Sequence, residues 1–190
     1  MTDLADRRDI ETDVYQPAED SGLLAEAAAA ELGPGERALE VGCGSGYVAA
    51  RVAETGADVV AADLNPHACR QARERGLQAV RADLVSPFRD GAFDAVLFNP
   101  PYLPADPDAE RSDWMEVALT GGENGRAVID PFLDSVGRVL APDGRVFLLV
   151  SSLTGVEDVM DRAGENGFSG AARVEESFPF ETLSVLELWR

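Results

Sequence analysis

Short apolar segments alternate with longer segments of helix-forming composition along most of the chain. The apolar segments are predicted to be strands, and they cover residues 38–41, 58–63, 77–81, 95–98, 146–150, 171–175 and 183–189. The segments between them are predicted to be helices, over residues 23–32, 47–55, 66–75, 128–140 and 156–165. Residues 183–189 alternate apolar and polar side chains, which is typical of an antiparallel strand. Alternation of strands and helices is typical of a parallel sheet.

The fold class that follows is α/β. We expect one domain over residues 1–190, built as a doubly wound, seven-stranded and mostly parallel sheet with helices on both faces and an antiparallel last strand. Asp20 or Ser21 is a candidate cap for the first helix. Residues 103–122 are polar and proline-rich, and they are expected to form a long loop, of the kind that usually carries function or else is disordered.

The charge balance narrows the classes of partner. The chain has 35 Asp and Glu against 16 Lys and Arg, a formal net charge of −19, and all 16 cations are arginine. At molar salt the screening length falls to about 3 Å, so an acidic surface of this kind suits a halophilic cell with a high-salt cytoplasm. The same excess of acidic residues argues against a protein that binds nucleic acid without a partner, because affinity for phosphates comes largely from cationic side chains.

Membrane and metal chemistry have little support in the residues. No apolar run approaches the roughly 20 residues that cross a bilayer, and the first residues are charged, so a soluble cytoplasmic protein is expected. Cys43, Cys69 and His67 fit no zinc-ligand spacing and no disulfide framework, so no metal site is expected and both thiols should be reduced.

A glycine-rich turn follows the first predicted strand. Gly42, Gly44 and Gly46 allow tight turning and close approach to a ligand, and the next helix offers its N-terminal N–H groups. A dinucleotide fingerprint needs glycine where Tyr47 stands, so a smaller ligand without a pyrophosphate is expected.

Two acids end the next strands. Asp63 can accept both hydroxyls of a ribose, and Asp83 is followed by Leu84, which can pack on a flat base, while Glu40 is placed to orient the turn or meet a ligand amine. Taken singly, an aspartate at a strand end is more often a helix cap or part of a solvated turn than a ligand contact. Together with the glycine turn they predict a nucleoside site at the carboxyl ends of the strands.

The sequence Asn99-Pro100-Pro101-Tyr102 after the fourth strand is the most specific signal. An amide-type nitrogen is a poor nucleophile because its lone pair is delocalised, so both of its N–H bonds must be engaged before it can attack a methyl group. The Asn99 side-chain oxygen and the Pro100 carbonyl can accept those two bonds from a rigid turn, with Tyr102 flanking the planar group.

These features resemble the class I S-adenosylmethionine-dependent methyltransferases that carry an Asn-Pro-Pro-Tyr signature. Residues 14–21, 120–126 and 181–186 further resemble the small archaeal and eukaryotic branch of the HemK-like family, which methylates the glutamine of Gly-Gly-Gln in class 1 translation termination factors. The resemblance spans nearly the whole chain, and together with the acidic composition it implies a halophilic archaeal member. It implies S-adenosyl-L-methionine as the cofactor and N5-methylation of glutamine as the reaction.

The resemblance also implies roles for individual residues. Ser21 and its neighbours would close over the methionine moiety, and Glu40 and Gly42 would line the cofactor. Further along the chain, Asp63 would hold the ribose, Asp83 and Leu84 the adenine, and Asn99 to Tyr102 the substrate amide. Cys43 is interpreted as packing rather than as a nucleophile.

The family implies a partner, a small zinc-binding activator protein. The third strand lies at an edge in the usual order of this fold, which leaves Gln78–Arg81 open to pairing with another chain.

Three alternatives remain open at this point. Adenine N6-methylation of nucleic acid presents the same delocalised nitrogen to the same four residues. A protein lysine methyltransferase fits less well, because an ammonium must first lose a proton. A catalytically silent cofactor-binding scaffold is the non-enzymatic alternative.

Overall fold

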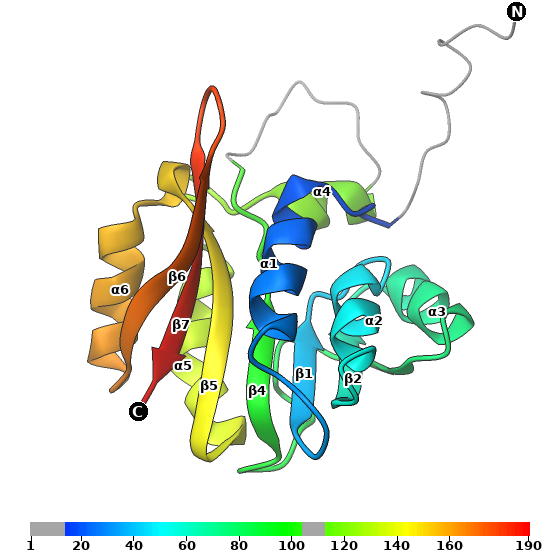
Figure 1. Ribbon diagram of the computed structural model, residues 1–190. Coiled ribbons are helices and arrows are strands. Elements are labelled where there is room, and N and C mark those ends of the chain that lie inside the picture. The colour runs from blue at the N-terminus through cyan, green and yellow to red at the C-terminus, as the bar shows by residue number, and fades with distance from the viewer. Residues whose placement is uncertain (1–13, 104–112) are drawn as a thin grey trace, which may run out of the picture.

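Seven strands form one twisted sheet in the order β3-β2-β1-β4-β5-β7-β6. A computed structural model describes residues 14–103 and 113–190 (Figure 1). All neighbouring strands from β3 to β5 are parallel, and β7 is antiparallel to both β5 and β6. The strands are β1 Arg37–Val41, β2 Asp58–Asp63, β3 Gln78–Arg81, β4 Phe93–Phe98, β5 Leu140–Ser151, β6 Ser169–Ser177 and β7 Thr182–Trp189. The predicted fold class is confirmed.

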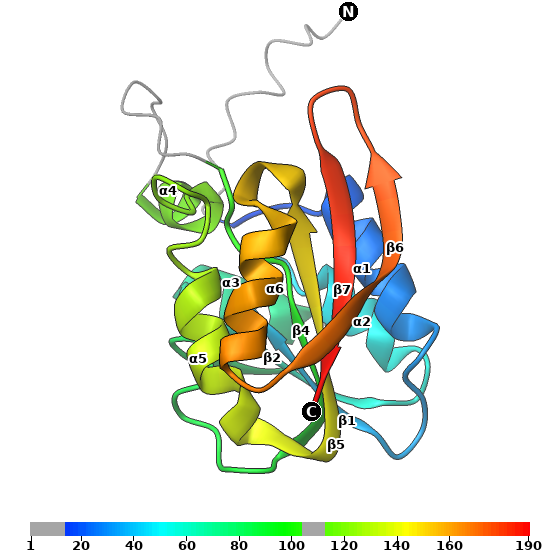
Figure 2. The same ribbon diagram turned by 90° about the vertical axis from the view of Figure 1, so that its left-hand side faces the viewer.

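Helices cover both faces of the sheet (Figure 2). Helices α1 (Glu19–Ala29), α2 (Tyr47–Ala53) and α3 (Pro66–Glu74) share one buried apolar cluster with the sheet. Helices α5 (Ile129–Val139) and α6 (Val156–Glu165) share a second cluster on the other face. The central strands are buried almost throughout, which explains their continuous apolar sequences.

The start of α1 differs from the prediction. The helix begins at Glu19, its N-cap residue is Ala18, and no side chain caps it. Asp20 and Ser21 lie inside the first turn and are buried, so neither is the cap. The sequence pattern was misleading because Asp20 accepts from the adjacent Ser21, from Tyr15 and from Asn99 rather than acting as the residue before the helix.

The long loop predicted over residues 103–122 is also wrong in part. It contains helix α4 (Asp113–Leu119), and Leu103 forms a parallel bridge with Thr120 that closes the segment at its base. Residues 104–112 of this prediction lie outside the described residues. Strand β5 begins at Leu140, so it is longer than the strand predicted over residues 146–150.

Strand β3 lies at one edge of the sheet, as the sequence predicts. Three of its four residues are exposed, and Val80 is 36% exposed. Within the described ranges, no helix is long and apolar enough to cross a membrane.

Candidate active site

The site lies where the strand order reverses, between β1 and β4. The register pairs Val41 with Phe98 on one side and with Ala62 on the other, so the residues that come next in the chain after these three lie close together. Those residues are Gly42, Asp63 and Asn99. Ligands of open α/β sheets bind outside the carboxyl ends of the strands at this switch point.

The glycine turn after β1 needs glycine for two different reasons. Gly42 and Gly44 have φ values of +62° and +50°, and a Cβ on them would lie 3.2 Å from the Phe98 ring and from the Tyr15 carbonyl oxygen, respectively. Both line the cavity. Gly46 instead packs against α3 and the residues after it, because a Cβ there would lie 3.1 Å from the Ala72 Cβ and 2.9 Å from Leu77. Gly46 therefore does not line the cavity, although it was expected to contact the ligand.

Asp63 links the turn to the end of β2. One of its carboxylate oxygens accepts the N–H of Gly44 at 2.9 Å, and the other accepts the N–H of Asn65 at 2.8 Å. Burial raises the pKa of Asp63, and these two N–H bonds oppose that effect. The carboxylate thus fixes the glycine turn and lines the cavity with its remaining lone pairs.

Glu40 is the buried acid beneath the turn. Its Oε2 accepts the N–H of Ala49 at 2.8 Å, in the first turns of α2. Burial raises the pKa of Glu40 to about 8, the Ala49 bond opposes this, and the nearby Asp63 adds to it. The side chain orients α2 and lines the same cavity.

This environment predicts a pH-dependent effect of Glu40→Gln. The folded protein holds the Glu40 proton more tightly than the unfolded chain, so the wild type loses stability as pH rises from about 4.5 toward about 8. Glutamine keeps an acceptor for Ala49 but has no such proton. We expect the variant to gain up to about 1.4 kcal/mol relative to wild type per pH unit in this window, and to gain nothing more above it. Melting temperatures of both ligand-free proteins from pH 5 to 9 measure this, and a constant difference would contradict it.

The end of β3 carries a strained residue. Leu84 has φ +48°, the one positive φ among the described non-glycine residues, and it lines the cavity beside Asp83. A leucine in this conformation is uncommon, and strain of this kind concentrates at ligand sites. The strained backbone therefore favours a ligand-binding role for Leu84 over simple core packing.

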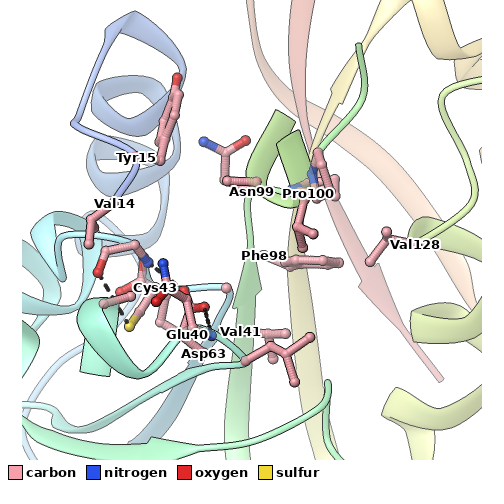
Figure 3. A pocket seen from close by; sticks show the side chains of 18 of the residues that line it. Val14, Tyr15, Glu40, Val41, Cys43, Asp63, Phe98, Asn99, Pro100 and Val128 are labelled. Atoms are coloured by element: carbon pink, nitrogen blue, oxygen red, sulfur yellow. Dashed lines mark hydrogen bonds between the residues drawn. The ribbon is translucent and has the colours of Figure 1, made fainter. Parts of the chain in front are cut away.

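Asn99 and Pro100 follow β4 directly. The Asn99 Nδ2 donates to Asp20 at 3.0 Å, and Tyr15 donates its hydroxyl to the same Asp20 oxygen at 2.8 Å. Figure 3 shows the Asn99 amide nitrogen turned toward the side of Tyr15 and its oxygen turned away. In the described part of the chain, no group donates to Asn99 Oδ1 or to the Pro100 carbonyl. Two acceptors therefore stand free beside the cavity.

Tyr102 completes the Asn-Pro-Pro-Tyr segment. Burial raises its pKa, and the carboxylates of Glu181 and Asp20 raise it further, so the phenol stays protonated. Glu181 belongs to the turn between β6 and β7 and accepts the hydroxyl of Ser151 at 2.5 Å. Gly125 lies against the Tyr102 carbonyl, because a Cβ on it would come within 2.8 Å of that oxygen.

The cavity that these elements enclose has a volume of about 290 Å³. Its walls include every predicted site residue except Gly46: Ser21, Glu40, Gly42, Gly44, Asp63, Asp83, Leu84, Asn99, Pro100, Pro101 and Tyr102. Residues that the sequence did not single out also line it, namely Tyr15, Phe98 and, from α4, Trp114 and Val117. Of these four, only Tyr15 could have been expected from the sequence, because residues 14–21 resemble the HemK-like family.

Neither a reactive thiol nor a metal site is found among the described residues of the cavity. Cys43 lines the cavity, but burial raises the pKa of its thiol, which disfavours a nucleophilic thiolate. Over residues 14–103 and 113–190, no cluster of three His, Cys, Asp or Glu side chains is arranged to hold a metal ion.

The fold and the site define a class of protein, the methyltransferases, and the sequence matches the methyltransferase domain family over residues 39–100. The chain is 34% identical to a Methanocaldococcus jannaschii protein named "Putative protein N5-glutamine methyltransferase", over 94% of this chain and 92% of that protein. It is 37% identical to methyltransferase HEMK2 of Homo sapiens, over 93% and 89% of the two chains. The E. cuniculi Mtq2-Trm112 complex, described as responsible for methylation of the eRF1 translation termination factor, superposes with a TM-score of 0.79 at 30% identity, covering 94% of this chain and 99% of that chain.

The chain therefore belongs to the HemK-like family of protein glutamine methyltransferases. The cofactor of this enzyme class is S-adenosyl-L-methionine, and the site fits it. Gly42 and Gly44 leave open the space that a Cβ would fill, and Asp63 and Leu84 lie at adjacent strand ends where a ribose and a base would sit.

Proposed function

We propose that the protein N5-methylates the glutamine of the Gly-Gly-Gln motif in a class 1 translation termination factor, in the cytoplasm. The observation that carries this is the pair of free acceptors, Asn99 Oδ1 and the Pro100 carbonyl, beside the cavity. A primary amide has two N–H bonds in one plane, and two fixed acceptors match them.

One set of residues holds the cofactor and another set holds the substrate. Asp63 accepts the ribose hydroxyls, Asp83 and Leu84 hold the adenine, and Ser21, Glu40 and Gly42 surround the methionine end. When bound, the cofactor supplies an electrophilic methyl group on sulfur. Asn99 and Pro100 engage both N–H bonds of the glutamine amide and so draw its lone pair out of conjugation toward that methyl group. Tyr102 flanks the amide plane.

No base is required before methyl transfer. The amide nitrogen becomes acidic only when it gains the methyl group, so its proton can leave to water afterwards. Catalysis by this site is therefore positioning together with stabilisation of the positive charge that develops on nitrogen.

The acceptor is identified by mass. The purified enzyme is incubated with S-adenosylmethionine and the termination factor of the same organism, and in parallel with total RNA and with the factor carrying Gln→Ala in Gly-Gly-Gln. We expect one added methyl group on that glutamine and none in the other two reactions. Methyl transfer to RNA adenine would support the rival adenine N6 activity, and transfer to the Gln→Ala factor would overturn the assigned acceptor.

The exposed edge of β3 supports a second part of the proposal, a small zinc-binding activator that pairs with Gln78–Arg81. Unpaired backbone groups at a sheet edge bind an added strand, and the exposed Val80 and Leu64 place apolar surface beside them.

Val80→Asp tests this docking edge. A carboxylate in place of an apolar contact should weaken binding of the activator at least 10-fold, on the order of 1.4 kcal/mol. Phe180→Asp, at the exposed turn near the opposite edge, is the matched control and should bind normally. Calorimetric titration of both variants gives the dissociation constants. Equal affinity for wild type and Val80→Asp would place the activator elsewhere.

The acidic composition supports a high-salt cellular setting, as in a halophilic archaeon. A net charge of −19 repels itself at low ionic strength, and salt relieves that repulsion. We expect the melting temperature to rise by about 10 °C or more between 0.1 and 3 M KCl. A melting temperature that is flat or falls with salt would argue for an ordinary cytoplasm.

A further inference from the structure

Asp20 is a buried acid that joins two distant parts of the chain. It lies in the first turn of α1 and is 6% exposed. Its Oδ2 accepts from Tyr15 at 2.8 Å and from the Asn99 Nδ2 at 3.0 Å, and its Oδ1 accepts from the Ser21 N–H at 2.6 Å. Asn99 is 79 residues away in sequence. The helix that begins the described fold is thus hydrogen-bonded to the segment that holds the substrate.

The fold gives little reason to bury this carboxylate. Removing a charged group from water costs free energy that its hydrogen bonds only offset. A negative charge favours the start of a helix, but the exposed Glu19 in the same turn already supplies one. Oδ1 accepts the Ser21 N–H of α1, but Oδ2 bonds to Tyr15 and Asn99, so α1 alone does not account for the position of this carboxylate.

The chemistry of the pair fixes the orientation of the Asn99 amide. An ionised carboxylate only accepts hydrogen bonds, whereas an amide can present either its NH₂ group or its oxygen. The NH₂ group must therefore face Asp20. Tyr15 reinforces this arrangement, because burial and then the Asp20 charge raise the pKa of its hydroxyl and keep it a donor. The amide oxygen is left to face other groups.

We propose that Asp20 is a positioning residue for methyl transfer, which holds Asn99 with its Nδ2 toward α1 and so presents Oδ1 to the acceptor nitrogen. The inference rests on the proposed function in one respect, that the acceptor is a planar NH₂ group. Such a group cannot accept a hydrogen bond from a flipped Asn99, because its lone pair is delocalised. In the flipped orientation, the NH₂ group of Asn99 would face the NH₂ group of the substrate, and two donors cannot form a hydrogen bond.

The carboxylate also strengthens the acceptor that it positions. A hydrogen bond from Nδ2 to a negative charge polarises the amide and places more negative charge on Oδ1. The acceptor nitrogen becomes positive as the methyl group arrives, so the gain is larger in the transition state than in the ground state. Loss of the Asp20 carboxylate should therefore lower kcat more than it raises KM.

Asp20→Asn is the informative variant, because it keeps the shape of the side chain and removes the acceptor-only character. We expect kcat to fall about 10- to 100-fold, the loss of one hydrogen bond to a charged group, with KM for the protein substrate and Kd for S-adenosylmethionine within about threefold of wild type. Glu19→Gln, in the same turn but exposed, is the matched control and should keep full activity.

A double-mutant cycle separates positioning from general support of the fold. On an Asn99→Ala background, Asp20→Asn should lower the residual rate less than threefold, because the group that it positions is already gone. An unchanged kcat in Asp20→Asn overturns the proposal. So does a fall in the Asn99→Ala rate by the same factor as in wild type, which is the result that a merely structural role gives.

Failure of the assigned substrate stays distinguishable from failure of this inference. Rates are measured by labelled methyl transfer to whichever acceptor the wild type modifies. Another planar NH₂ acceptor, such as an adenine amine, overturns the proposed function alone, whereas a lysine acceptor overturns both. A readout without turnover is the side-chain ¹⁵N–¹H signal of Asn99, identified by its loss in Asn99→Ala. It should shift in Asp20→Asn and stay unchanged in Glu19→Gln, and a signal that does not move in Asp20→Asn overturns the proposal.

Discussion

Asn99→Ala should lower kcat at least about 10²-fold while Kd for S-adenosylmethionine stays within about threefold of wild type. The variant removes one of the two acceptors that engage the amide N–H bonds, but it leaves the glycine turn and Asp63 in place. Single-turnover methylation measures the rate, and calorimetric titration measures cofactor affinity.

The control for Asn99→Ala is an asparagine outside the cavity. Asn166 lies at the end of α6 and donates to Asp134 on the surface, so Asn166→Ala should retain full activity. Turnover by Asn99→Ala at the wild-type rate would remove the Asn99 oxygen from the mechanism. A large loss of cofactor affinity would instead move Asn99 into the cofactor site.

Asp63→Ala should raise Kd for S-adenosylmethionine at least about 10²-fold. Two hydrogen bonds from ribose hydroxyls to a carboxylate are worth roughly 3 kcal/mol together. The N–H groups of Gly44 and Asn65 would also lose their acceptor, so the turn itself should loosen and the melting temperature should fall. Titration with the cofactor and thermal unfolding measure the two effects.

Asp58→Ala is the matched control on the same strand. Asp58 begins β2 and Asp63 ends it, and Asp58 is exposed and paired with Arg37 at the surface. Exposed pairs contribute little, so this variant should bind the cofactor normally. Equal affinities of Asp63→Ala and wild type would remove the acid from the ribose site.

Local pattern was enough for most elements of the fold. The strand over Asp58–Asp63 and the helix over 156–165 match their predicted bounds, because burial on both faces gives continuous apolar strands and amphipathic spacing gives helices. The α4 segment was missed because its surroundings are polar and proline-rich, with composition typical of a loop. The cap of α1 was mispredicted because the helix begins one residue before Asp20, so Asp20 lies inside the first turn, where one of its oxygens accepts from Ser21 and the other from Asn99.

The sequence by itself determined which chemical groups stand at the strand ends. The glycine turn, Asp63, Leu84 and the Asn99 segment all line one cavity, since parallel strands bring their carboxyl ends to the same edge. Tertiary structure alone decided how those groups are held. Gly46 turned out to face α3 instead of the cavity, and Asp20, 79 residues from Asn99, turned out to accept a hydrogen bond from its amide. Residue patterns report which face of an element is buried, but the direction of a side chain within a site depends on partners from distant segments.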